Sequence, residues 1–372
     1  MKIEPIRVLH VLGGLKAGGA ESFVINLYRA IDKNLVQFDF VKHIEDEGIF
    51  ESEIVESGGR IYRCPKYNGK NHFAYCKWWD SFFKEHPEYN IVHGHVRSTA
   101  SLYLKIAKEH GLVTIAHSHS TSNGSGISAI VKNIMQYPIR YVADYLFACS
   151  DKAGAWLYGK KAIRRENYKI VPNGVDLRRF AFNEEKRVQI RHKLGILDDT
   201  FVIGHIGRFT FPKNHKFLVE LFAEYHKKNV NSKLLLVGDG EESESVRAQC
   251  VHLGVSDSVI MVGSKTNTED YYQAMDVFAF PSLWEGLGIV AIEAQANGLI
   301  CLLSENIPCE AVLTENIKVI PLKLKKLWIK ELKKIYVGER MFTKNNKIKQ
   351  YDVYSIANRL EMFYLEQSGR EM

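Results

Sequence analysis

Proline, cysteine and long apolar runs are scarce in this chain, and each absence excludes a class of protein. Only 9 of the 372 residues are proline, and no apolar run approaches the ~18 residues that a membrane-spanning helix requires. The six cysteines form no Cys-x-x-Cys pair and no dense disulfide framework. The first residues lack the basic-then-apolar order of a secretion signal. We therefore expect a cytoplasmic protein with reduced thiols.

An excess of one charge is also missing from most of the chain. Lys and Arg number 50 against 43 Asp and Glu, which gives a net charge of +7. Residues 318–350 hold eleven Lys or Arg and two Glu, a local charge of +9, so the other 339 residues sum to −2. Nucleic-acid binders are usually basic over a whole face. We therefore expect a near-neutral globular protein with one basic segment, and no nucleic-acid partner.

Short β-branched runs alternate with amphipathic stretches along both halves of the sequence. This alternation predicts an α/β fold with two doubly wound parallel sheets, each covered by helices on both faces. In the first half we expect strands at 6–12, 36–41, 91–95, 113–117 and 145–150, and helices at 20–31, 73–85, 98–110 and 126–142. In the second half we expect strands at 201–206, 234–237, 259–262, 277–280 and 300–303, and a last helix at 352–367.

The alternation breaks at residues 171–176, and a polar connector follows. We accordingly divide the chain into 1–176, 177–350 and a C-terminal helical segment, 351–372. Ligands of open α/β sheets bind beyond the carboxyl ends of the strands. Two such sheets facing each other would place the ligand in an interdomain cleft.

A glycine-rich loop joins the first expected strand to the first expected helix, with Gly13, Gly14, Gly18 and Gly19 in one short stretch. Clustered glycines let backbone N–H groups approach an anion, and the helix N-terminus adds partial positive charge. The loop is not a clean Gly-x-Gly-x-x-Gly. A plain tight turn and a phosphate cradle both remain open.

Two cations follow the first expected strand of the second half. Arg208 and Lys213 are separated by a short turn that contains Pro212. A guanidinium grips phosphate oxygens in a fork and an ammonium acts as a point charge, so the pair suits a diphosphate. Two solvated surface cations are the alternative interpretation.

The segment 281–293 is the most informative part of the sequence. Glu285 lies in a loop with Gly286, Leu287 and Gly288, and Glu293 lies two turns into the helix that we expect next. The spacing places both carboxylates near one face. Carboxylates can bind sugar hydroxyls, and the exposed N–H groups of the loop can meet phosphate.

Taken in order, these motifs resemble the retaining nucleotide-sugar glycosyltransferases of the bacterial group 1 (family 4) type, most of all the exopolysaccharide and capsule biosynthesis members. The resemblance extends to about residue 320, and the strongly basic stretch after Asn316 departs from it. It is carried by the glycine-rich start with Ala20-Glu21, and by residues 91–95, 148–150, 171–176, Gly207-Arg208 with Lys213, 237–240, and Glu285 with Glu293.

The resemblance implies the GT-B fold, with an acceptor-side N-terminal domain, a nucleotide-sugar-binding C-terminal domain, and a last helix that returns to the N-terminal domain. It implies retaining transfer of a hexose from a nucleoside-diphosphate sugar, with UDP as the expected nucleotide. The acceptor would be a lipid-linked or other oligosaccharide, used in cell-surface polysaccharide synthesis at the inner face of the membrane. No cofactor is implied, and the absence of any Asp-x-Asp pair predicts metal-independent transfer.

The resemblance also implies residue roles. Arg208 and Lys213 would hold the diphosphate and stabilise its charge as the sugar leaves. Glu285 would hold the donor-sugar hydroxyls and Glu293 the ribose hydroxyls. The remaining expected contacts are Gly14 at the diphosphate, Gly263 near the base, Gly286, Leu287 and Gly288 at the phosphates, and His117 beside the reacting sugar.

We assign this role to His117 rather than to His119 because His117 falls at the end of its expected strand. Four imidazoles, in His93-Gly94-His95 and His117-Ser118-His119, also allow a remote alternative, a metal-dependent hydrolase. A nicotinamide enzyme would need an acidic residue at the end of the second strand, where Lys42 stands and Asp39 is mid-strand. A nucleotide-sugar epimerase or another GT-B enzyme is the nearer alternative.

The basic segment, residues 322–336, has amphipathic helical spacing. Its apolar residues Leu324, Leu327, Trp328, Leu332 and Ile335 would line one side, and its lysines would cluster elsewhere. An ordinary outer helix with solvated lysines is one interpretation. Salt-reversible docking of the lysine face on anionic lipid is the other.

Overall fold

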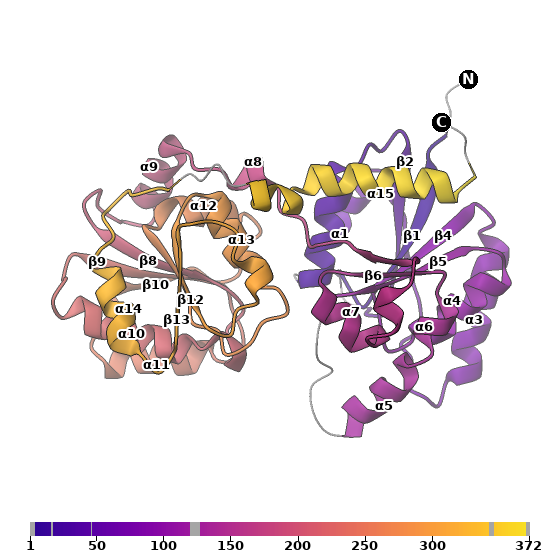
Figure 1. Ribbon diagram of the computed structural model, residues 1–372, viewed down its shortest axis with the longest axis horizontal. Coiled ribbons are helices and arrows are strands. Elements are labelled where there is room, and N and C mark those ends of the chain that lie inside the picture. The colour runs from indigo at the N-terminus through magenta and orange to yellow at the C-terminus, as the bar shows by residue number, and fades with distance from the viewer. Residues whose placement is uncertain (1–3, 16–17, 46, 120–126, 342–345, 370–372) are drawn as a thin grey trace. The chain divides into compact units, whose positions relative to one another are not determined.

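The structure is a computed structural model that describes residues 4–15, 18–45, 47–119, 127–341 and 346–369. Its internal contacts divide the chain into two units (Figure 1). The N-unit comprises Met1–Gly174 with Gln350–Met372, and the C-unit comprises Val175–Lys349. The first boundary falls in the Pro172-Asn173-Gly174 stretch, where the strand–helix alternation of the sequence stops.

The N-unit is built on a seven-stranded parallel sheet with the order β3-β2-β1-β4-β5-β6-β7. The strands are β1 (Ile6–Leu12), β2 (Val36–Lys42), β3 (Ile61–Arg63), β4 (Tyr89–Gly94), β5 (Val113–Ser118), β6 (Tyr145–Ala148) and β7 (Tyr168–Ile170). Strand β1 lies between β2 and β4, and its register pairs His10 with His93. The sheet is buried on both faces because helices cover each of them.

Two apolar cores lie on the two faces of this sheet. The first contains side chains of α1 (Gly19–Ala30), α2 (Glu51–Glu56) and α15 (Val353–Gln367). The second contains side chains of α3 (His72–Glu85), α4 (Ala100–Glu109), α6 (Ile139–Val142) and α7 (Asp151–Tyr158). Helix α15 contacts α1 and β2 although more than 300 residues separate them in the chain (Figure 1).

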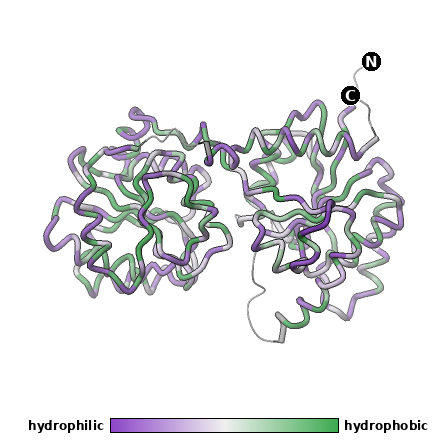
Figure 2. The backbone as a smooth tube through the Cα atoms, viewed as in Figure 1, coloured by the Kyte–Doolittle hydropathy of each residue, from purple (hydrophilic) through white to green (hydrophobic). Residues whose placement is uncertain are grey.

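The C-unit repeats the architecture with a six-stranded sheet of order β10-β9-β8-β11-β12-β13. The strands are β8 (Phe201–Ile206), β9 (Ser232–Val237), β10 (Val259–Met261), β11 (Val277–Phe280), β12 (Ile300–Ser304) and β13 (Ile317–Ile320). The helices are α8 (Leu177–Phe180), α9 (Glu184–Lys193), α10 (His215–His226), α11 (Ser243–His252), α12 (Thr268–Ala274), α13 (Ile289–Ala296) and α14 (Lys325–Leu332). Hydrophobic residues run along the central strands of both units (Figure 2). The prediction of two doubly wound parallel sheets is confirmed.

Several expected elements differ from those observed. The single helix expected at 126–142 is two helices, α5 (Ile127–Gln136) and α6, because Pro138 cannot continue the hydrogen-bond ladder of α5. Three strands, β3, β7 and β13, were not predicted. Each is a short edge strand of three or four residues, too brief to show a periodic pattern. The basic helix is confined to the eight residues of α14 within the expected 322–336.

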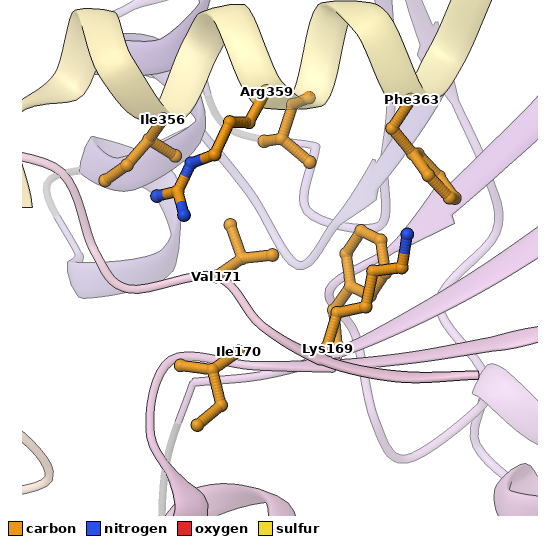
Figure 3. Close-up of a pocket in the computed structure, with 8 residues that line it drawn as sticks. Lys169, Ile170, Val171, Ile356, Arg359 and Phe363 are labelled. Atoms are coloured by element: carbon orange, nitrogen blue, oxygen red, sulfur yellow. The ribbon is translucent and has the colours of Figure 1, made fainter. Parts of the chain in front are cut away.

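A hollow in the N-unit separates α15 from the end of β7 (Figure 3). Ile356, Arg359 and Phe363 line it from α15, and Lys169 and Val171 line it from the opposite side. The Lys169 ammonium lies 4.5 Å from the centre of the Phe363 ring, so a cation–π contact covers part of the hollow. None of the predicted site residues lines it.

Candidate donor-binding site

A tight turn carries Arg208 and Lys213 from the carboxyl end of β8 into α10. The turn packs closely against the loop after β9: a Cβ added to Gly238 would lie 2.1 Å from the carbonyl oxygen of Gly207. Asn214, the only non-glycine residue with positive φ in the described part of the chain (56°), caps the start of α10. The backbone around the two cations therefore packs closely against the neighbouring loop.

The loop after β11 is attached to this turn because β8 and β11 are neighbouring strands. The backbone N–H of Leu283 donates to the carbonyl oxygen of Pro212 at 2.7 Å. The Asn214 side-chain amide donates to the carbonyl oxygen of Pro281 at 3.1 Å. Two segments about 70 residues apart in sequence thus form one rigid surface at the carboxyl edge of the sheet.

Lys213 and Glu285 meet on this surface. The Lys213 Nζ donates to Glu285 Oε1 at 2.7 Å, and both side chains are mostly buried. The same ammonium lies 5.0 Å from the centre of the Phe280 ring. Arg208 is exposed, and its guanidinium makes no hydrogen bond or ion pair to any described residue. Lys213 is therefore held in place by its carboxylate partner, whereas the Arg208 guanidinium is available to a ligand.

The glycine loop leads from Glu285 into the N-terminus of α13. Gly288 has φ 82°, a conformation that glycine adopts without strain, and it begins the helix. Among the described residues no acceptor takes the backbone N–H groups of Gly286, Leu287 or Gly288. These donors lie next to the positive end of the α13 dipole, an arrangement that suits an anion.

Glu293 lies in α13 and is mostly buried. Tyr272, from α12, donates its hydroxyl to Glu293 Oε2 at 2.8 Å. Burial raises the pKa of Glu293 to about 7, with the nearby Glu269 acting in the same direction and Arg179 and Lys213 opposing it. Near neutral pH this carboxyl is therefore divided between its neutral and ionised forms.

The buried carboxyl of Glu293 makes a stability prediction possible. The folded state holds its proton up to about pH 7, whereas an unperturbed glutamate loses it near 4.5. The contribution of Glu293 alone to stability should therefore fall by up to roughly 3 kcal/mol as pH rises from 4.5 through 7, and by no more above that. Glu293→Gln, which can still accept from Tyr272, should be more stable than wild type at pH 8 and equal to it near pH 4.5.

Urea unfolding of both proteins across this pH range measures the difference. Glu315→Gln, a change at an exposed carboxylate of the same unit, is the control. Its stability relative to the wild type should not change between pH 4.5 and pH 8. An unchanged stability of Glu293→Gln at pH 8 would contradict a buried, proton-holding Glu293.

The other expected contacts lie apart from this surface or at its margin. Gly263 follows β10 with φ 73°, and its carbonyl oxygen accepts from the N–H of Gly238 at 2.9 Å. Gly14 follows β1 in the N-unit, where an added Cβ would lie 3.2 Å from Ile44 Cδ1. The structure thus brings Arg208, Lys213, Glu285, Glu293 and residues 286–288 into one part of the C-unit, and places Gly14 and His117 in the N-unit.

His117 belongs to a cluster of five histidines near the carboxyl ends of β1, β4 and β5. The members are His10, His93, His95, His117 and His119. His117 is 1% exposed and its Nδ1 lies 3.1 Å from His93 Nε2, whereas His119 lies just past β5 and is partly exposed. Burial lowers the pKa of every member, that of His10 to about 3 and that of His119 to about 4. The rings are therefore neutral at physiological pH.

A nicotinamide enzyme would need an acidic residue at the end of β2, and the structure shows how Asp39 and Lys42 of this strand are used instead. Asp39 is fully buried in the middle of β2, where it pairs with Arg7 at 2.5 Å and accepts from Tyr89 at 2.7 Å. Lys42, the last residue of β2, is ion-paired with Glu51 at 2.5 Å. Both are parts of the N-unit core, and no ribose-binding carboxylate ends this strand.

Solved structures with the same architecture define the class. The structure of Anabaena HepE in complex with UDP and glucose superposes with a TM-score of 0.76, at 17% identity, over 96% of this chain and 99% of that one. WaaG, a glycosyltransferase involved in lipopolysaccharide biosynthesis, gives a TM-score of 0.73 at 17% identity, over 96% and 99%. The fold is therefore GT-B, as predicted.

Sequence comparison then gives the family. The model for "Glycosyl transferases group 1" matches residues 186–351, and that for "Glycosyltransferase Family 4" matches residues 17–179. EpsF of Bacillus subtilis, named as a glycosyltransferase, is 34% identical over 81% of this chain and 79% of its own. UDP-Gal:alpha-D-GlcNAc-diphosphoundecaprenol alpha-1,3-galactosyltransferase of Escherichia coli is 27% identical over 58% of each chain. The chain belongs to the group 1, family 4 glycosyltransferases, which disfavours the hydrolase interpretation.

Three residues of the site region were not singled out from the sequence. Phe280 packs under the Lys213 ammonium, Tyr272 binds Glu293, and His10 adds a fifth ring to the histidine cluster. Only His10 carried a usable signal, since it stands near the carboxyl end of an obvious strand. The other two act through contacts that depend on how separate elements pack.

Proposed function

We propose that this glycosyltransferase moves a hexose from UDP-hexose to a lipid-linked saccharide, with retention of anomeric configuration. The observation that carries the proposal is the joined surface of the C-unit, where the Lys213–Glu285 pair lies between the end of β8 and the glycine loop before α13. It combines cations, unbonded N–H groups and carboxylates, which are the groups that a diphosphate and a sugar require.

The identity of the donor and the acceptor is supported by the named relatives. The Escherichia coli relative is named for a UDP-galactose donor and a diphosphoundecaprenol-linked acceptor. The capsular polysaccharide biosynthesis glycosyltransferase CapM of Staphylococcus aureus, 34% identical over 33% of this chain, supports a role in capsule or other cell-surface polysaccharide synthesis.

In the proposed reaction, the acceptor oxygen bonds to the anomeric carbon as the bond from that carbon to the diphosphate oxygen breaks. The departing phosphate takes the acceptor proton, so no side-chain base is needed. Arg208 and Lys213 stabilise the negative charge that builds on the diphosphate. Glu285 positions the sugar, Glu293 binds the ribose, Gly263 lies near the base and Gly14 near the diphosphate.

His117 is the histidine proposed to lie beside the reacting sugar. His117 is buried and His119 is partly exposed, so variants of the two histidines test which of them has this role. If His117 holds the sugar, His117→Ala should lower kcat more than His119→Ala does. The reverse order would transfer the role to His119.

A thermal-shift panel of UDP, GDP, ADP and their sugars tests the donor. UDP and a UDP-hexose should raise the melting temperature, and Arg208→Ala should remove most of that shift. Product analysis by NMR with and without acceptor then separates an α-linked transfer product from epimerised donor. Stabilisation by GDP alone, or a product of inverted configuration, would contradict the proposal.

We expect transfer to proceed without a divalent ion, because the cations at the diphosphate are side chains. The wild-type rate should be the same with and without an excess of chelator. A strict requirement for Mn²⁺ or Mg²⁺, restored by adding the ion back, would contradict metal-independent transfer.

We further propose that the enzyme is cytoplasmic and docks on the inner face of the membrane through α14. No described helix is long and apolar enough to cross a bilayer. Trp328 and Leu332 are buried against the C-unit core, so the apolar side of α14 is already used. Lys323, Lys326, Lys330 and Lys333 remain exposed, which favours electrostatic docking over insertion, at about 1 kcal/mol per well-placed lysine.

The triple variant Lys326→Glu, Lys330→Glu, Lys333→Glu should no longer sediment with anionic liposomes at low salt. The control changes Lys152, Lys160 and Lys161 to Glu, which alters the net charge equally at exposed positions of the N-unit, and it should sediment like the wild type. High salt should release the wild type, because exposed charges are screened. Equal binding to neutral liposomes would leave only the solvated-helix interpretation.

A further inference from the structure

We propose that His95, His117 and His119 form a binding site for a transition-metal ion of the zinc class, where a bound ion would compete with the sugar contact proposed for His117. The ligand atoms of these three side chains all lie within 4.8 Å of one another. They come from the loop just after β4, from β5 and from the residue after β5, so two neighbouring strands present them from one edge of the N-unit sheet.

Each of the three rings has one nitrogen already occupied by a neighbour behind it. The contacts are His95 Nε2 with His10 Nδ1 at 3.0 Å, His117 Nδ1 with His93 Nε2 at 3.1 Å, and His119 Nδ1 with Asn173 Oδ1 at 3.3 Å. Metal-binding histidines show this arrangement, because the second nitrogen is held by an outer partner that sets the orientation of the ring. The outer layer here extends further, since Tyr364 contacts His93 Nδ1 at 2.6 Å.

The remaining nitrogens are the ones that a metal ion would use. His95 Nδ1 and His119 Nε2 lie 2.8 Å apart and share one hydrogen bond. His117 Nε2 is buried and has no hydrogen-bond partner among the described residues. A buried polar atom without a partner costs about 1–3 kcal/mol, and coordination would remove that cost.

The chemistry of the set indicates which ions fit. Burial keeps all three imidazoles neutral, and the described groups around them include no carboxylate ligand. Imidazole nitrogen suits Zn²⁺, Cu²⁺ and Ni²⁺ rather than Mg²⁺ or Ca²⁺. In a tetrahedral site with metal–nitrogen bonds of about 2.0–2.1 Å, the ligand atoms are roughly 3.3 Å apart. The distance between His95 Nδ1 and His119 Nε2, 2.8 Å, must therefore increase by only about 0.5 Å. Water would take the fourth position.

A second triple, His10, His93 and His95, also has its ligand atoms within 4.8 Å. All three of its members are buried, with exposures of 0%, 0% and 7%. His119 is partly exposed and gives the first triple a path by which an ion can enter. Because His95 belongs to both triples and His119 to only one, their variants separate the two sets.

The test is a Co²⁺ titration of the full chain, prepared without a histidine tag and freed of metal with chelator. Visible absorption bands should saturate at one equivalent, and Zn²⁺ should displace them. His119→Asn and His95→Asn should each weaken Co²⁺ binding on the order of 100-fold. His252→Asn removes an exposed histidine of the C-unit, serves as the control, and should bind as the wild type does.

Each other outcome overturns the proposal. Absence of saturable bands excludes a site in the cluster, and bands that survive both variants place the ion on other histidines. Loss in His95→Asn with retention in His119→Asn assigns the ion to the fully buried triple. If His95→Asn fails to fold, His119→Asn decides alone, because its side chain is partly exposed. No sugar donor is used, so these results do not depend on the proposed transfer reaction.

Discussion

Replacing Glu285 with alanine is expected to abolish sugar transfer while leaving the fold intact. The carboxylate lies in the loop between β11 and α13, which we propose holds the donor, and its single described ion pair is with Lys213 at 2.7 Å. Its loss removes the proposed contact to the sugar hydroxyls and also frees the Lys213 ammonium from its position. Since both effects weaken transition-state stabilisation, we expect kcat to fall by 10³-fold or more, on the order found when a preorganised polar group is removed.

Steady-state transfer from UDP-hexose measures this effect, with circular dichroism and a melting curve to confirm folding. Glu285→Gln retains the shape and a hydrogen-bond acceptor but not the charge, so it should fall between wild type and alanine. Glu315→Ala, at an exposed position of the same unit, should leave the rate unchanged. Near-wild-type turnover of a folded Glu285→Ala protein would show that this carboxylate does not act on the sugar.

Arg208→Ala and Lys213→Ala should each lose about 2–4 kcal/mol of transition-state stabilisation, or roughly 30- to 1,000-fold in kcat/KM. The two variants should differ in their effect on stability. Arg208 is exposed and bonded to no described side chain, so its removal should have no effect on stability. Lys213 is paired and mostly buried, so its removal leaves the Glu285 carboxylate without its cation and should also lower the melting temperature.

Initial rates and melting curves of the two variants test this difference. Lys216→Ala is the matched control, because it removes an exposed lysine of α10 three residues beyond Lys213. Wild-type kcat/KM in either Arg208→Ala or Lys213→Ala would remove that cation from the proposed diphosphate site. Equal stability of wild type and Lys213→Ala would show that the ion pair contributes only locally to positioning.

Glu293 illustrates how far a motif can be interpreted without a structure. The sequence predicted Glu293 in the helix that follows the glycine loop, and it lies in α13. The neighbours of that carboxyl could not be predicted, because Tyr272 belongs to α12 and Glu269 lies at its start. The raised pKa of Glu293 follows from this packing and not from the residues beside it in sequence.

The sequence alone determined the two parallel sheets, most of their strands and the family, because strand and helix periodicities are local properties and the motifs follow strand ends in order. It did not determine the break at Pro138 as a helix boundary, the short edge strands, or the elements of the N-unit, α1 and β2, that α15 contacts. Only the tertiary structure joined Lys213 to Glu285 and gathered five histidines at one edge. Both depend on which strands are neighbours, β8 with β11, β1 with β4, and β4 with β5, and that order is set by the packing of the whole sheet.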